Sequence, residues 1–563
     1  MKLTALSKTL IAIVILGGAG SLLWNSGLKM WIQKKGEAVS TGTSGSSAAK
    51  PAAAADSHAA ARAPHTKSAP LGSAANPLTV SIVSFHGYAP ALVANGNSLL
   101  TQPGSIFERN GVHVEFVIQD DIPTLATIFE ADTAQCAWRT SDFWAQEQPN
   151  LVNAHHDGRA VMIVDNTQGA DAIIARDPNI TRVEDLVGKK IALLKYTPSH
   201  GLLIDTIKNS SLNAKQKAGI LDNLVYVNAD DGTAGVRAAF DAGHVDAAVL
   251  WDPDLSLAIK AAPGSHVVYS TRYASNLIYD VMVCNSQYLN NPANEAAFKG
   301  FVAGWMEGVE AAKQNPTGAA DALVRTEPFF DQLAKEQGVG FIASLFPNLV
   351  WTGLDDNARI LGLVGGTNHY ARVYREFDGI YREAGALANP TSPVIAPAQS
   401  VDTHFIEALL ANNQAAKTAA ARPQFTFDPA GLQKAGAKTA ALTKPVTVNF
   451  LSGSADLSKR AKDVIDHQVV PFIDNNGSSY FEISGNTDST GTHDVNMQLS
   501  KARAQAVVQY LTTQWEIPRN RFKVVGNGPD HPLCNEENPA DSSMSLDDCR
   551  QMNRTTRIAV LGS

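Results

Sequence analysis

Residues 480–504 read YFEISGNTDSTGTHDVNMQLSKARA, and this stretch decides the fold of the C-terminal part of the chain. Its first five residues are rich in aromatic and β-branched types, which predicts a strand at 480–484. The next residues, 485–491, begin and end with glycine and are polar between, as is typical of a loop. A helix is predicted over 494–515. The stretch therefore indicates a strand, a polar loop and a long helix in succession.

Three polar residues of this stretch can share one pocket. Asp488 directly follows the predicted strand. Asn496 and Arg503 are seven residues apart, which is close to two helical turns, so both lie on one face of the predicted helix. An acid and a guanidinium in one pocket can form charge-assisted hydrogen bonds with a zwitterionic group. The alternative is that Asp488 and Arg503 are ordinary surface charges.

The pattern continues on both sides and gives the order βαβαββ. This order, with the spacing Thr-Asp, Asn, Leu-Ser and Arg-Ala, resembles the outer membrane protein A-like peptidoglycan-binding domain, an α+β fold, over about 445–561. We assign 445–563 to this domain. Its other elements are predicted as strands at 446–450, 521–525 and 557–561 and a helix at 458–472.

The resemblance implies that the domain grips the diaminopimelate of the peptidoglycan peptide stem. In this sequence the implied contacts are Asp488 and Arg503, with Asn496 on the same face. Two positions depart from the family pattern: Asn486 replaces the usual histidine, and Asn553-Arg554-Thr555 replaces Asn-Arg-Arg. The second departure weakens the expectation of a contact from Arg554.

Four cysteines in 563 residues exclude a disulfide-dense mini-protein and a cysteine-rich zinc protein. Cys534 and Cys549 bracket a polar loop, which predicts a disulfide and hence an oxidising compartment. A zinc site there would need two more ligands, and only His531 is near. Cys136 and Cys284 are each isolated in the sequence and are expected to be small buried side chains.

The larger unit, assigned to 77–410, alternates strand and helix patterns. Its first strands read LTVSIVSF at 78–85 and VHVEFVI at 112–118, and six further apolar runs follow up to residue 284. Residues 294–410 are expected to be mainly helical. Interleaved strands and helices predict an α/β fold, in which ligands bind beyond the carboxyl ends of the strands.

The loops at those strand ends carry a resemblance to a known family. HGYAP at 86–90 follows the first strand, and VEDLVGKK at 183–190 is a further phrase that contributes to the resemblance. As an ordered set, such phrases resemble the periplasmic substrate-binding proteins of the nitrate/sulfonate/taurine ABC-transporter group, which have a type II two-lobed fold. The phrases GADAIIA at 169–175 and IYDVMV at 278–283 look like the two crossings between lobes.

The loops also provide candidate ligand contacts. A helix start near 197–200 suits an anionic group, although the same residues can be an ordinary helix cap. Aspartates after the strands favour an amine, another cation or a polyhydroxyl compound and argue against a small inorganic anion, although each can instead cap a helix or fix the hinge. Aromatic residues can form walls or core. The candidates are Tyr88, Asp142, Thr197, Ser199, His200, Trp251, Asp252 and Asp280.

Enzymatic chemistry finds little support in the sequence. No Ser/His/Asp nucleophile signature and no Walker-type phosphate loop occurs. The run His155-His156-Asp157 is better explained as a loop than as a metal site, because adjacent residues on a strand point to opposite faces. Enzymes of a related fold in thiamin-pyrimidine synthesis carry a cysteine-rich motif that is absent here. We therefore expect no enzyme activity, no cofactor and no metal.

The remaining segments concern attachment. The apolar run in 1–36 is flanked by lysines and predicts a signal anchor with a transmembrane helix, with a cleaved secretory signal as the alternative. An Ala/Ser/Pro-rich flexible tether is predicted at 37–76 and a linker at 411–444. The net charge of −8 argues against nucleic acid as a partner.

These observations predict a periplasmic solute-binding protein that is fixed to peptidoglycan and anchored in the inner membrane, or secreted if the signal is cleaved. The expected partners are a small organic solute, peptidoglycan and an ABC permease. Two alternatives stay open: an envelope tether or ligand sensor without a transport role, and an enzyme on the same fold.

Overall fold

The computed structural model describes residues 66–448, 450, 453–539 and 544–562. The first of three sheets has six strands in the order β11-β4-β10-β3-β1-β2, in which β1 is parallel to β2 and β3 while β10 is antiparallel to β3 and β4. Its strands are β1 (Leu78–Ile82), β2 (Val114–Ile118), β3 (Cys136–Thr140), β4 (Gly158–Thr167), β10 (Tyr279–Asn285) and β11 (Leu349–Trp351).

Helices surround this first lobe, and the expectation of a helical segment after residue 294 is confirmed. The helices before the second lobe are α3 (Ala89–Ala94), α4 (Ile106–Arg109), α5 (Ile122–Thr127) and α6 (Ser141–Asn153). Those after it are α11 (Ser286–Leu289), α12 (Glu295–Gln314), α13 (Pro316–Thr326), α14 (Pro328–Gln337), α15 (Val339–Leu345), α16 (Leu354–Ile360), α17 (His369–Glu383), α18 (Pro397–Ser400) and α19 (His404–Ala411).

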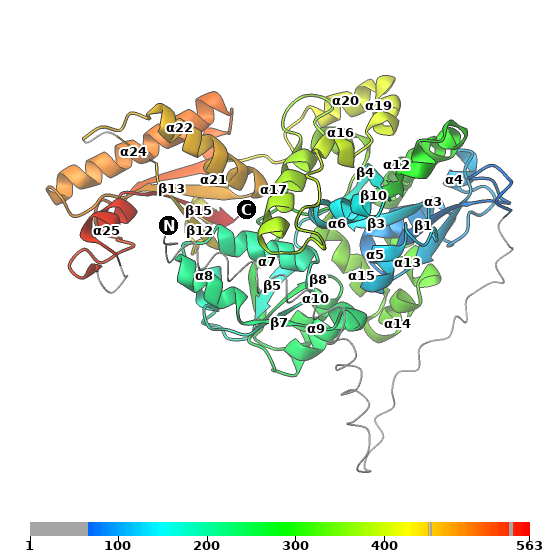
Figure 1. Cartoon of the computed structure of the whole chain (residues 1–563), viewed down its shortest axis with the longest axis horizontal. Coiled ribbons are helices and arrows are strands. Elements are labelled where there is room, and N and C mark those ends of the chain that lie inside the picture. The colour runs from blue at the N-terminus through cyan, green and yellow to red at the C-terminus, as the bar shows by residue number, and fades with distance from the viewer. Residues whose placement is uncertain (1–65, 449, 451–452, 540–543, 563) are drawn as a thin grey trace, which may run out of the picture. The chain divides into compact units, whose positions relative to one another are not determined.

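The second lobe is built on a five-stranded sheet with the order β7-β6-β8-β5-β9. Alternate residues of β5 pack on opposite sides: Ile173 joins the core beneath α7 and α8, whereas Ala172 and Ile174 join Val236 and Leu255 of α9 and α10 (Figure 1). This alternation follows from the two-residue period of a strand. The elements are β5 (Asp171–Ala175), β6 (Ile191–Leu193), α7 (Pro198–Lys208), α8 (Ala214–Leu221), β7 (Leu224–Tyr226), α9 (Gly232–Asp241), β8 (Ala247–Trp251), α10 (Asp254–Ala261) and β9 (His266–Ser270).

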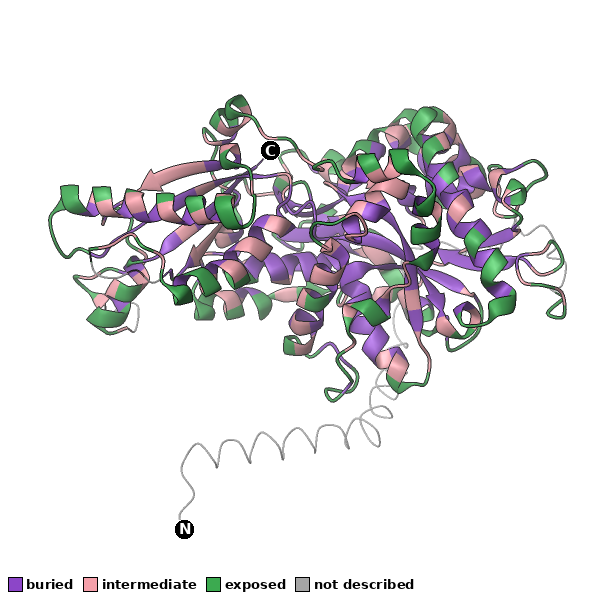
Figure 2. Ribbon diagram, turned by 90° about the horizontal axis from the view of Figure 1, so that it is seen from above, coloured by how far each residue is buried: buried purple, intermediate pink, exposed green. Residues whose placement is uncertain are grey.

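The chain crosses between the two sheets twice. It leaves the first sheet after β4 and enters the second at β5, so residues 168–170 form one crossing. It returns between β9 and β10, over residues 271–278. Buried residues run along the strands on both sides of the crossings, and exposed residues lie mainly on outer helix faces (Figure 2). The predicted two-lobed α/β fold is confirmed.

Cys136 and Cys284 form a disulfide, which corrects the expectation that each is isolated. They stand opposite each other in the antiparallel pair of β3 and β10, although 148 positions separate them in the sequence. Both side chains are fully buried, as expected. The pairing was missed because it depends on strand neighbours that only the folded sheet brings together.

The third sheet belongs to the terminal domain and has the order β12-β15-β13-β14. The βαβαββ order is observed with one short helix added before the last strand. The predicted first strand at 446–450 is displaced: the observed strand ends at Val446 and includes Pro445, which pairs with Arg557. The elements are β12 (Leu442–Val446), α22 (Lys459–Val464), the π-helix η8 (Ile465–Val469), α23 (Val470–Asn475), β13 (Tyr480–Gly485), α24 (His493–Gln514), β14 (Phe522–Gly526), α25 (Leu546–Asn553) and β15 (Thr556–Gly562).

Two predicted flexible segments contain ordered structure. Residues 66–76, assigned to the tether, form turns, and the carbonyl of Gly72 accepts a hydrogen bond from the backbone N–H of His113 at 2.7 Å. The predicted linker at 411–444 holds α20 (Gln414–Ala420) and α21 (Pro429–Ala435). The predicted anchor at 1–36 lies outside the described residues, and within the described part of the chain no helix is long and apolar enough to cross a membrane.

Candidate functional site

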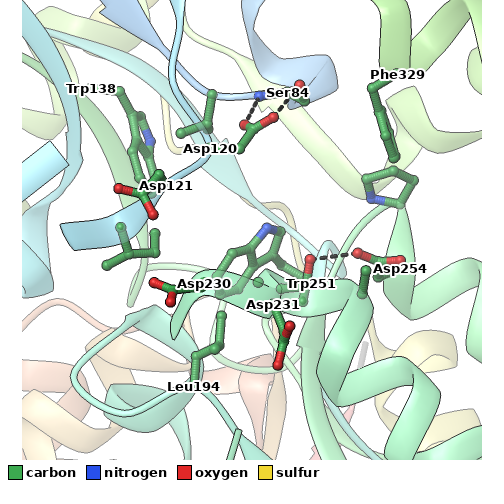
Figure 3. Close-up of a pocket in the computed structure, with 16 residues that line it drawn as sticks. Ser84, Asp120, Asp121, Trp138, Leu194, Asp230, Asp231, Trp251, Asp254 and Phe329 are labelled. Atoms are coloured by element: carbon green, nitrogen blue, oxygen red, sulfur yellow. Dashed lines mark hydrogen bonds between the residues drawn. The ribbon is translucent and has the colours of Figure 1, made fainter. Parts of the chain in front are cut away.

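Two connected cavities lie between the lobes. The outer cavity, of about 280 Å³, is lined by residues that follow β1, β2, β7 and β8 and therefore by both lobes. The inner cavity, of about 20 Å³, lies deeper against β3, β5 and β10. Both are lined by Val83, Trp138 and Trp251, so together they form one cleft. Figure 3 shows the two tryptophans and the aspartates of both lobes around the outer opening.

Asp280 on β10 is the central carboxyl of the inner cavity. Its Oδ2 accepts hydrogen bonds from the Tyr88 hydroxyl at 3.2 Å and from Nε1 of Trp138 at 2.9 Å. Burial raises the pKa of Asp280 to about 7, and the neighbouring charge of Asp142 acts in the same direction. Asp280 therefore changes its charge near neutral pH.

Three further aspartates are buried around Asp280. Asp165 on β4 pairs with Asp280 in the sheet register, and neither of its oxygens takes part in a hydrogen bond. Burial and the charges of Asp280 and Asp171 raise the pKa of Asp165 well above its usual value. Asp171 lines the inner cavity, and burial with the charges of Asp280, Asp142 and Asp252 raises its pKa in the same way. Burial raises the pKa of Asp142 to about 6.

The outer cavity carries a second group of acids. Asp120 accepts hydrogen bonds from the backbone and the hydroxyl of Ser84, both at 2.7 Å. Asp121 caps α5 through the N–H of Thr124 at 2.8 Å. Asp254 pairs with Arg237 at 3.1 Å. Asp230 and Asp231 lie in η5 (Ala229–Asp231), a short helix of the second lobe that contacts α5 of the first.

The sequence candidates divide into cleft residues and supporting residues. Trp251 and Asp280 line the cleft, and Tyr88 lies behind Asp280. Asp252 instead accepts hydrogen bonds from Ser256 at the start of α10 and from Asn348 at 2.8 Å, so it has the capping role that the sequence left open. It lines neither cavity.

The helix-start candidates surround the first turn of α7. The Thr197 hydroxyl donates to the carbonyl of Leu194 at 2.9 Å, so it neither caps α7 nor faces the cavities. Ser199 is buried, and its hydroxyl has no hydrogen-bond partner. The ring of His200 contacts Tyr196 and Tyr226 and lines neither cavity; burial and then the charge of Lys195 lower its pKa to about 4.

Several cleft residues were missed by sequence reasoning. The adjacent pairs Asp120-Asp121 and Asp230-Asp231 follow strands that the sequence did predict, so the strand-end rule could have found them. Asp165 lies in β4 and Asp171 in β5, on the two sides of the first crossing, and both lie near Asp280. Thr140 belongs to the polar strand-end run Thr140-Ser141-Asp142, of which only Asp142 is a candidate, whereas Thr167 and Trp138 have no signal of their own in the sequence.

In the terminal domain, a cavity of about 210 Å³ is lined by Phe450, Arg503 and Arg554, among others. The Arg503 guanidinium lies 5.0 Å from the centre of the Phe450 ring, and its Nε donates to the carbonyl of Ser454 at 3.1 Å. Arg554 forms an ion pair with Asp488. The departure from the family pattern at 553–555 weakens the expectation of a contact from Arg554, yet the structure places Arg554 beside Asp488.

Asn496 holds the loop that follows Asp488. It is buried, and its Nδ2 donates to the carbonyl of Thr490 at 3.0 Å. Cys534 and Cys549 are bonded to each other. Within the segment they close, Glu536 accepts a 2.7 Å hydrogen bond from the hydroxyl of Ser489. The disulfide loop is therefore attached to the loop that carries Asp488.

Comparison with known proteins agrees with the division of the chain. Residues 107–319 match the model of the family described as NMT1/THI5 like, and residues 449–544 match the OmpA family. The chain carries an NMT1/THI5-like domain followed by an OmpA family domain. The first match includes Trp138, Asp171 and Asp280, whereas Arg554 lies after the end of the second.

Similar proteins correspond to one domain or the other. The Peptidoglycan-associated lipoprotein of Pseudomonas putida is 34% identical over 94 residues, 17% of this chain and 55% of its own length. A protein of Escherichia coli (strain K12), named as a candidate aliphatic sulfonates-binding protein, is 34% identical over 87 residues, 16% of this chain and 24% of its own length. These matches thus span from a quarter to just over half of the relatives.

A solved structure similar to this chain is the periplasmic aliphatic sulphonate binding protein SsuA from Escherichia coli. It is 18% identical, with a TM-score of 0.44, and the alignment covers 59% of this chain and 99% of that one. The expected combination of a larger α/β domain and a C-terminal OmpA-like domain agrees with the two family matches.

Proposed function

We propose that this protein captures a small organic solute in the cell envelope while its OmpA family domain attaches it to peptidoglycan. The observation that carries the proposal is one chain with two separate polar pockets. The first is the cleft between the lobes, and the second is the pocket lined by Arg503 and Arg554, beside Asp488, which pairs with Arg554. A wall-binding domain would place both pockets in the periplasm.

The terminal pocket suits a zwitterionic peptide-stem group. Arg503 and Arg554 offer guanidinium donors to a carboxylate, and Asp488 offers an acceptor to an ammonium. The name of the Pseudomonas putida relative supports the same target. In this proposal a bound stem competes with Arg554 for Asp488, so the ion pair opens as the ligand enters.

The cleft suits capture by closure of two lobes. A ligand that contacts both lobes binds the closed state better, and that difference in affinity drives closure. We propose delivery to an ABC permease and retention at the inner membrane by the predicted anchor, with an envelope sensor without a permease as the alternative. We also propose binding without catalysis; the four cysteines are all in disulfides, so thiol nucleophile chemistry is the one class of catalysis that this observation argues against.

Cosedimentation with diaminopimelate-type sacculi tests the wall attachment. The full-length protein should pellet with sacculi, and replacing both Asp488 and Arg503 by alanine should leave it in the supernatant. Each removal leaves a partner charge of the stem unpaired, a loss of about 2–5 kcal/mol. Changing exposed Asp222 to asparagine is the matched control. Undiminished pelleting of the double variant would overturn the site.

A further inference from the structure

We propose that the cleft between the lobes binds an organic cation, an amine or a quaternary ammonium compound, with its charge held by aspartates of both lobes and its carbon groups against Trp138 and Trp251. This inference rests on the proposed solute-binding function and names the class of solute. It differs from the ligand in the names of the sulfonate-binding relatives, which is an anion.

The charges of the cleft all have one sign. Among the described residues that line the two cavities there are seven aspartates and no lysine, arginine or histidine. Arg237 pairs with Asp254, whereas within the described part of the chain no lysine, arginine or histidine forms an ion pair with the other six lining aspartates. The lining aspartates are Asp120, Asp121, Asp171, Asp230, Asp231, Asp254 and Asp280.

The inner cavity also holds polar groups that lack partners. Thr140 and Thr167 both line it and are only 2% exposed; no hydrogen bond of normal geometry reaches either hydroxyl, although each lies close enough to a carboxyl, Thr140 to Asp142 and Thr167 to Asp171, to act on its pKa. Unpaired buried hydroxyls are costly, and a bound ligand with N–H or O–H groups would satisfy them. The two hydroxyls line the same cavity as Asp171 and Asp280, so the N–H or O–H groups of a ligand and its positive charge would be bound at one place.

The aromatic residues fit the same ligand. Trp138 and Trp251 line both cavities, Phe85 lines the inner one, and Phe329 lines the outer one. The Trp138 indole is fixed because its Nε1 donates to Asp280. Aromatic faces attract cations, and cages of such rings recognise quaternary ammonium groups. Acids and indoles therefore act together on a cation, whereas both would disfavour an anion.

The position best suited to an anion is already opposed by a carboxyl. The first turn of α7 presents backbone N–H groups near the inner cavity, which Pro198 lines. A Cβ placed on Gly201 of that helix would lie 2.8 Å from Oδ2 of Asp142. The Asp142 carboxyl thus lies against the positive end of α7 and leaves it unsuited to a sulfonate.

The acids at the mouth explain why a cation would draw the lobes together. Asp121 belongs to the start of α5 in the first lobe, and Asp230 and Asp231 belong to η5 in the second; α5 and η5 are in contact. Like charges on facing lobes repel one another, and a cation between them removes that repulsion. The contribution of the mouth is expected to fall with rising salt.

Titration of the full-length protein with a fixed set of probes tests this inference, with tryptophan fluorescence and calorimetry as readouts. The cations are choline, tetramethylammonium and putrescine. The matched neutral probe is the carbon analogue of choline, in which tert-butyl replaces trimethylammonium, and the anions are methanesulfonate and nitrate. At least one cation should bind saturably, and the neutral analogue and both anions should bind at least about tenfold more weakly, a difference of about 1.4 kcal/mol.

Variants locate the binding in the cleft. Asp280→Asn and Asp171→Asn should each weaken the best cation about 10- to 100-fold, because each removes a buried charge-assisted contact. Asp222→Asn, on the exposed surface of the second lobe, should leave the affinity unchanged. If a buried variant fails to fold, the exposed pair Asp230→Asn and Asp231→Asn should still weaken binding and reduce its salt dependence.

Three results would overturn the inference: no saturable binding by any of the cations, equal binding of choline and its neutral analogue, or tighter binding of methanesulfonate than of every cation. If methanesulfonate binds more tightly than every cation and solution scattering shows that the lobes close on it, the proposed solute-binding function stands and only the assignment of the solute as a cation is rejected. Loss of both ligand-dependent closure and sacculus binding would instead remove the proposed function.

Discussion

Replacing Asp280 by asparagine should change how the stability of the protein depends on pH. Burial raises the pKa of Asp280 from 3.8 to about 7. The folded state therefore holds this proton more tightly than the unfolded state. The stability that the group contributes is fully present below its unfolded pKa and is lost as pH rises from 3.8 to about 7.

The size of the effect follows from that pKa difference. Each pKa unit corresponds to 1.36 kcal/mol, so roughly 4 kcal/mol is lost across this range. Asparagine does not titrate and avoids this loss, but its amide replaces a carboxyl acceptor of Tyr88 and Trp138 at a cost of about 1 kcal/mol. The variant should be less stable than the wild type by about 1 kcal/mol near pH 4 and more stable by roughly 2–3 kcal/mol near pH 8.

Urea unfolding followed by tryptophan fluorescence measures this, since five of the six described tryptophans precede the terminal domain and lie in the two lobes. The difference between variant and wild type should be taken across the pH range, which removes the contributions of groups that do not interact with Asp280; Asp165 and Asp171, whose pKa values the Asp280 charge raises, remain in the difference. The exposed Asp222→Asn variant should show no sign change. An Asp280→Asn protein that is less stable than the wild type at every pH would refute the conclusion that burial raises the pKa of the Asp280 carboxyl.

Four other predictions follow the remaining features. Cation affinity of the cleft should rise as pH increases between about 5 and 8, because the carboxyls of Asp142 and Asp280 lose their protons over this range. The titratable groups that face them are Tyr88, Asp165 and Asp171. Calorimetry should detect proton release on binding, and an affinity that does not depend on pH would contradict this. Arg554→Gln should weaken sacculus binding by about tenfold, because it removes one guanidinium of the terminal pocket. The control Lys459→Gln changes an exposed residue and should bind sacculi like the wild type. Equal pelleting of the two variants would exclude Arg554 from the site. Changing Cys136 and Cys284 to serine should lower the free energy of unfolding by about 2–5 kcal/mol, because the bond closes a loop of 148 positions, and an unchanged urea midpoint would count against it. Protein prepared from the periplasm without reductant should have Cys534 and Cys549 bonded, as peptide mapping would show, and free thiols there would contradict the prediction.

The fold was predictable where the decisive signals are local. The loop between β13 and α24 contains the Thr-Asp motif within a few residues, and the apolar runs of the lobes show their strands directly. The phrases at 169–175 and 278–283 indicated the two crossings because each begins where the chain passes from one sheet to the other. The first strand of the terminal domain was misplaced because Pro445 looked like a boundary, yet it lies within β12.

The cleft was less predictable because its residues come from distant parts of the chain. Asp165 pairs with Asp280 across β4 and β10, and this neighbour relation has no trace in either local sequence. Asp252 was overvalued for the opposite reason: it follows a strand as a ligand contact would, but its oxygens are used by Ser256 and Asn348. Position at a strand end locates a candidate, and only the hydrogen bonds show whether the side chain is free for a ligand.

The bond between Cys136 and Cys284 also has a mechanical consequence. Every strand of the second lobe lies between these two residues, so that lobe is a loop whose two ends are joined covalently in the first sheet. A pull on the chain from before Cys136 and after Cys284 passes through one sulfur–sulfur bond and leaves the second lobe unloaded. The strands β5 to β9 therefore stay unloaded when the chain is pulled, whereas the cleft residues that precede Cys136, such as Val83 and Asp120, lie in the loaded part.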